Sequence, residues 1–256
     1  MRPQSLTRFS LLAVIIFALF SCNEKEEYNT DKLSDYIVLT PGKYITYRID
    51  SMVFTNFGRT TEIHRYQVKH VIDAQVPDNL GRPSYRVYVY IRDSAGLQPW
   101  QPAGNTYFIT PLADQMELIE NNLRFIKMHL PIKDAFSWRG NTYLPTDPYG
   151  SVYNFSNDND MVDWDFHYDG NPSSFSYRGM NYADVLTVEE ADNSFNIPIT
   201  PSASYAARSR AVEKYSKNIG LVYREYELWE YQQNTGNPAG PYKIGFGITM
   251  WMIDHN

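Results

Sequence analysis

Apolar and polar residues alternate over most of the chain downstream of Gly42. Ile45, Tyr47 and Ile49 alternate with polar residues, which is the period of a strand with one buried face. Further stretches of strand character are Thr61 to Ala74, Tyr85 to Arg92, Gly104 to Thr110, Gln115 to Leu130, Met161 to Tyr168, Met180 to Glu190, Ile219 to Gln232 and Tyr242 to Ile253.

Two segments break this pattern. Pro131 to Asp160 is rich in Pro, Gly, Asn and aromatic residues and predicts a long irregular connection. Ser204 to Lys217 combines a capping Ser with Ala, Arg, Glu and Lys, and predicts a short helix. Because strand otherwise follows strand through short turns, we expect an all-β fold. It is mainly antiparallel, a sandwich or a partly closed barrel with one short helix.

The first residues have the pattern of a secretory signal. Arg2 and Arg8 precede an apolar run from Phe9 to Phe20. That run is too short to cross a bilayer, which takes about 20 residues. We therefore expect residues 1–21 to be a signal peptide.

Leu19-Phe20-Ser21-Cys22 resembles the bacterial lipobox, with Leu19 and Ser21 at the matching positions. The resemblance implies that Cys22 carries acyl chains such as palmitate and begins the mature protein. Cys22 is the only Cys of the chain, so it forms no internal disulfide. A lipid bilayer is thus the first expected partner.

Lys25-Glu26-Glu27 resembles the surface-export signal of Bacteroidota lipoproteins. The resemblance implies an outer-membrane lipoprotein facing the cell exterior, whereas a merely solvated tether would leave periplasmic display open. We expect residues 22–41 to form a lipidated, flexible tether and residues 42–256 a single β-rich domain.

Charge excludes one class of partner. The chain has a formal charge of −6, and cleavage after residue 21 removes Arg2 and Arg8, leaving 21 basic against 29 acidic residues. A mature charge of −8 argues against nucleic-acid binding. Anionic lipid repels such a surface too, so the acyl anchor must hold it at the membrane.

A second resemblance concerns the C-terminal strands. Residues 215–225, read with residues 182–188, resemble an element of uncharacterised bacterial lipoproteins and exported β-proteins. There a Tyr-small-Lys segment leads through an Ile/Val-Gly-Leu-Val turn into a long strand. The resemblance implies a β architecture and indicates nothing about a chemical activity.

Acidic residues cluster between positions 157 and 170. Four of them form a weak calcium candidate, because carboxylate oxygens suit Ca²⁺: Asp158, Asp160, Asp163 and Asp165. The spacing does not fit an EF-hand loop. The alternative is a half-buried strand that shows its acidic face to water. We expect no cofactor.

No motif indicates catalysis. The five His residues form no metal-binding spacing, and Glu189 and Glu190 point to opposite faces of a strand, so they cannot flank one bond. A secreted hydrolase would need carboxylates that the fold alone assembles, and two carboxylates converging in a pocket would favour it.

Loop aromatics are the remaining candidates for ligand contact, through stacking on sugars or anchoring of a protein: Trp100, Trp138, Tyr143, Tyr149 and Tyr153. The alternative is that they cover the end of a barrel or sandwich. The sequence thus favours a non-catalytic binding or accessory module for a glycan, a peptide or a membrane protein. A hydrolase and a purely structural envelope component stay open.

Overall fold

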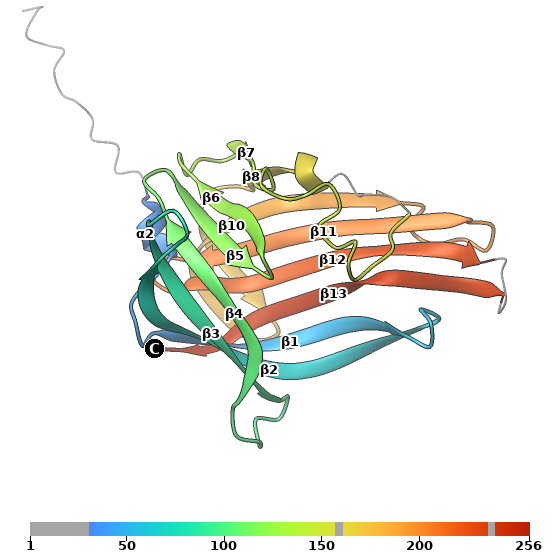
Figure 1. Ribbon diagram of the computed structural model, residues 1–256, viewed down its shortest axis with the longest axis horizontal. Helices are drawn as coiled ribbons and strands as arrows, with labels where there is room; N and C mark the ends of the chain where they lie inside the picture. Colours follow the sequence, from blue (N-terminus) through green and yellow to red (C-terminus); the bar gives the residue numbers. More distant parts are fainter. Residues whose placement is uncertain (1–30, 157–160, 235–238) are drawn as a thin grey trace, which may run out of the picture. The chain divides into compact units, whose positions relative to one another are not determined.

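The computed structural model describes residues 31–156, 161–234 and 239–256 (Figure 1). Cys22, its lipobox and Lys25-Glu26-Glu27 lie outside these residues. The elements are α2 (Leu33–Tyr36), β1 (Tyr44–Thr55), β2 (Thr60–Pro77), β3 (Pro83–Asp93), β4 (Gln101–Pro111), β5 (Gln115–Glu120), β6 (Leu123–His129), β7 (Ser137–Arg139), the 3₁₀ turn η1 (Met161–Asp163), β8 (Asp165–Tyr168), β9 (Ser173–Tyr177), β10 (Met180–Phe195), β11 (Tyr205–Ser216), β12 (Gly220–Asn234) and β13 (Gly240–His255).

All described strands belong to one antiparallel sheet in the order β6-β5-β4-β3-β2-β1-β13-β12-β11-β10-β8-β7, with β9 beside β10. Most neighbours are consecutive in the chain, so hairpin turns build the sheet. One such turn joins β5 to β6 through Asn121 and Asn122, both with positive φ. Pairing of β1 with β13 joins the two halves, which confirms the predicted antiparallel all-β class.

The sheet curls until its two ends touch. The Ile126 N–H in β6 donates to the carbonyl of Gly140, which follows β7, at 2.8 Å, and the Trp138 indole N–H donates to the Ile126 carbonyl at 2.8 Å. A barrel that is nearly closed results. Its interior is shielded from water, and the inward side chains pack as two hydrophobic clusters.

Helix α2 packs near the start of β12. Leu33 and Tyr36 are buried, and the Tyr36 hydroxyl donates to Asp31 at 2.6 Å. Lys217 holds the same carboxylate at 2.5 Å, and the Asn218 N–H donates to the Asp35 carbonyl at 2.6 Å. Residues 31–36, which the sequence assigns to the tether, are thus fixed to the barrel.

The helix predicted from Ser204 to Lys217 is wrong, because this segment is strand β11. Its composition favours a helix only weakly, and β11 pairs along its length with both β10 and β12. The short helix of the fold is α2 instead. None of the described helices has the length and apolar character needed to cross a membrane.

We predict that Gly245→Ala destabilises the fold far more than Gly170→Ala. Both glycines have positive φ, but a Cβ on Gly245 would lie 2.1 Å from the Leu228 carbonyl oxygen, whereas Gly170 has open space. Backbone strain costs about 1 to 3 kcal/mol at either site, and the clash at Gly245 adds about 1 to 3 kcal/mol. Equal free energies of unfolding in urea for the two variants would contradict this account.

Candidate functional site

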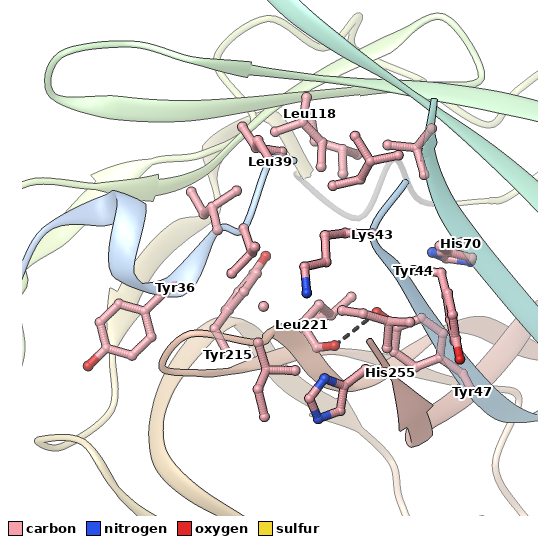
Figure 2. A pocket seen from close by; sticks show the side chains of 18 of the residues that line it. Tyr36, Leu39, Lys43, Tyr44, Tyr47, His70, Leu118, Tyr215, Leu221 and His255 are labelled. Carbon is pink, nitrogen blue, oxygen red and sulfur yellow. Dashed lines mark hydrogen bonds between the residues drawn. The ribbon is translucent and has the colours of Figure 1, made fainter. Parts of the chain in front are cut away.

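A cavity opens inside the barrel beside α2 (Figure 2). Its wall is mostly apolar and its volume is about 90 Å³. The lining residues that matter below are Tyr36, Leu39, Lys43, Tyr47, His70, Val87, Tyr107, Met116, Leu118, Tyr215, Leu221, Arg224, His255 and Asn256. In Figure 2, Tyr36 and Leu39 lie on one side, His70 and Tyr47 on the other, and Lys43 points into the space between them.

Alternation along neighbouring strands builds this wall. Tyr47 in β1, Val87 in β3 and Leu118 in β5 are inward positions and are buried. Because β1 to β5 are adjacent in the sheet, these side chains form one continuous apolar surface. Tyr36 of α2 borders the cavity from outside the sheet.

Tyr47 and His70 in the wall are hydrogen-bonded and carry no charge. The Tyr47 hydroxyl donates to the Leu221 carbonyl at 2.8 Å (Figure 2). His70 Nδ1 lies 3.0 Å from the Tyr107 hydroxyl. Burial, helped by the positive charge of Arg224, lowers the pKa of His70 to about 3. The imidazole is therefore uncharged at neutral pH and adds no charge to the cavity.

An ion cluster lies deeper in the barrel and consists of Lys127, Glu190, Glu213 and Arg224. Lys127 Nζ lies 2.6 Å from Glu190 Oε1 and 3.3 Å from Glu213 Oε1. Arg224 Nε donates to Glu213 at 2.7 Å. The Tyr215 hydroxyl also donates to Glu213. Arg224 and Tyr215 line the cavity as well, so they connect it to the cluster.

The two carboxylates of the cluster have very different pKa values. Burial raises the pKa of Glu190 to about 7, against the attraction of Lys127. Burial also disfavours charge on Glu213, but Lys127 and Arg224 outweigh it and lower its pKa to about 2. Between these values Glu213 is ionised and Glu190 keeps its proton. Sequence reasoning missed this pair, although charged residues at inward strand positions are a signal for it.

Glu189 and Glu190 lie on opposite faces of β10, as expected. Glu189 bonds to Arg210 at 2.8 Å on the outside. A hollow of about 620 Å³ beside this part of β10 is lined by both Glu189 and Glu190, by His167 and by residues 191–195. Asp163 and Asp165 lie at this hollow, and both pair with Arg139 at 3.1 Å. Asp158 and Asp160 lie outside the described residues. Within the described ranges, no three His, Cys, Asp or Glu side chains are grouped as a metal site would require.

The five candidate aromatics do not form one surface. Trp138 is buried in the core against Phe166 and Tyr168. Tyr149 and Tyr153 both pack on Phe246, with ring centroids 5.5 and 5.6 Å apart.

Trp100 and Tyr143 have separate surroundings. Trp100 stacks under Arg92 at 4.1 Å and Lys69 at 4.8 Å. Tyr143 is 53% exposed, with Arg124 5.8 Å from its ring. The candidates therefore occupy different environments, and none of them lines the cavity.

The chain resembles known proteins only weakly. No family model and no curated protein matches the chain. A domain from Vibrio parahaemolyticus, named for outer membrane lipoprotein sorting, shares 11% identity at a TM-score of 0.19 over 84% of this chain and 85% of that one. A DUF1329 family protein from Desulfovibrio piger shares 10% identity at a TM-score of 0.18 over 85% of each chain. Likenesses this low carry no argument about ligand or activity.

We predict that ionisation of Glu190 destabilises the fold as the pH rises from about 4.5 to about 7. A carboxyl whose pKa is raised by folding holds its proton in the folded state while the unfolded chain has lost it, so stability falls across this window. In Glu190→Gln this loss disappears. The free energy of unfolding in urea, measured at pH 5 and at pH 7.5 for both proteins, tests this prediction.

Glu189→Gln is the matched control, because its carboxylate lies on the outer face beside Arg210. The free-energy gap between Glu190→Gln and the wild type must change with pH in the variant's favour, while the gap for Glu189→Gln does not. A constant gap for Glu190→Gln would show that Glu190 is already ionised in the folded protein at pH 5.

Proposed function

We propose that this chain is an outer-membrane lipoprotein, anchored through acylated Cys22 and displayed on the cell surface, whose β-domain is a non-catalytic binding module. Its ligand site is the cavity beside α2, and its ligand is a slim apolar molecule. The observation that carries the proposal is an apolar cavity kept open inside an otherwise packed barrel.

The sequence supports the anchor. Cys22 follows Leu19 and Ser21 at the end of an apolar signal run, and Lys25-Glu26-Glu27 comes directly after it. Multiple acyl chains give stable membrane attachment, since each buried methylene contributes about 0.8 kcal/mol. The anchor brings the domain close to a source of apolar molecules.

The dimensions of the cavity favour an alkyl chain over the other ligands that the sequence leaves open. A volume of about 90 Å³ is smaller than the ~150 Å³ cavity that binds benzene in a protein core. A short segment of an alkyl chain fits such a space, whereas a sugar ring or a folded peptide does not. Sugars also need convergent polar groups, whereas Val87, Met116 and Leu118 make one side of the wall apolar. Tyr47 and His70 already bond to other protein groups.

A hydrolase is the second candidate, because Glu190 and Glu213 converge on Lys127 and the pKa of Glu190 is raised to about 7. Glu190 lines the hollow beside β10, but the Glu190 and Glu213 side chains are each only 2% exposed, so a substrate has little access to the pair. Turnover of a soluble ester or glycoside by the wild type, abolished in both Glu190→Gln and Glu213→Gln, would favour the hydrolase.

We predict that replacing Lys25-Glu26-Glu27 with Ala removes the protein from the cell surface. The test is protease shaving of intact cells, followed by detection of the protein in membrane fractions. The wild type should be cleaved, while the triple variant should be protected and still membrane-bound. Protection of the wild type would place the domain on the periplasmic side instead.

We predict that 1-alkanols bind the domain and that each methylene added to the chain lowers the Kd about fourfold until the cavity is full. Calorimetric titration of the mature chain with Cys22→Ala, which carries no acyl group, measures this series. Val87→Phe places a larger side chain in the cavity wall and should weaken binding at least about tenfold.

Val152→Phe is the control, because Val152 is 69% exposed and does not line the cavity. Thermal unfolding of both variants separates loss of binding from loss of fold. Equal affinity in Val87→Phe and Val152→Phe, with both folded, would contradict the assignment of the cavity as the ligand site.

A further inference from the structure

The charged side chains around the cavity are all basic. The chain has 29 Asp and Glu residues, yet no Asp or Glu is among the described residues that line the cavity. Lys43, Arg224, His70 and His255 do line it. In a protein with a surplus of acid, this arrangement lowers the cost of bringing a negative charge to this one place.

Two members of this basic set, Arg224 and His70, are already neutralised or neutral. Arg224 donates to Glu213 at 2.7 Å and lies 3.7 Å from Glu120. The pKa of His70 is lowered to about 3 by burial, so its ring is uncharged. Lys43 differs, since in the described part of the chain its ammonium forms no ion pair. Its side chain points into the cavity (Figure 2).

Lys43 also lies at the exposed end of the cavity, away from its buried end. Val87 and Met116 are 1% and 2% exposed and form the deep end of the cavity. Lys43 is half-buried, while His255 and Asn256 are exposed, so these three mark the mouth. A molecule lying in the cavity would have its apolar end against Val87 and Met116 and its other end beside the Lys43 ammonium.

We propose that the ligand is a single-chain anionic amphiphile whose head group binds the Lys43 ammonium at the mouth and whose alkyl chain extends toward Val87 and Met116. This inference rests on the proposed function and specifies its ligand class. A carboxylate or a phosphate monoester satisfies the same chemistry, because each offers acceptor oxygens to an ammonium. A quaternary ammonium head is disfavoured by the same charge.

The test compares octanoate, octyl phosphate, 1-octanol and octyltrimethylammonium at pH 8 by calorimetric titration of the mature chain with Cys22→Ala. An ion pair at a partly desolvated site should make at least one of the two anions bind about tenfold more tightly than 1-octanol. A preference for octanoate assigns the head to fatty acids, and a preference for octyl phosphate assigns it to lipid phosphates; either result supports the proposal.

Lys43→Gln should abolish the preference, so that neither anion binds more tightly than 1-octanol. Lys133→Gln, at an exposed residue that does not line the cavity, should keep the preference. If 1-octanol binds as tightly as both anions, or if the preference survives in Lys43→Gln, this inference fails while the apolar site stands. If none of the four compounds binds, the proposed function fails.

Discussion

Everything in this structure depends on the closure of one curved sheet. The ends of the sheet meet at Ile126, whose backbone bonds to Gly140 and to the Trp138 indole, each at 2.8 Å. Glycine is required at 140, because a Cβ there would lie 2.2 Å from the Phe166 ring. Without this seam, water would reach the inward face, and neither buried charges nor an apolar cavity would persist there.

Closure gives the interior two different regions. Next to the seam, Lys127 of β6 reaches Glu190 of β10 and Glu213 of β11, so one ammonium links strands from both arms of the sheet. Buried ion pairs of this kind add little net stability, because the cost of taking the charges out of water offsets their attraction. Near α2 the side chains do not fill the space, and Arg224 connects that cavity to the ion pairs.

The strands could be predicted from the sequence because period-two alternation is a local signal. The error at residues 204–217 arose where helix-favouring composition competed with pairing to two distant neighbours, which no local pattern reveals. The cavity could not be predicted, because Tyr36, Val87 and Leu221 come from segments far apart in the chain. Alternation shows which side chains point inward, but not where their packing leaves a gap.

The proposed function depends on ligand binding in the cavity beside α2. Nuclear magnetic resonance of the isotope-labelled mature chain with Cys22→Ala, titrated with octanoate, tests it most directly. We expect the chemical shift changes to concentrate at Val87, Leu118 and Leu221, which line the cavity. Shifts confined instead to Tyr149 and Tyr153, which pack on Phe246 outside the cavity wall, would contradict it.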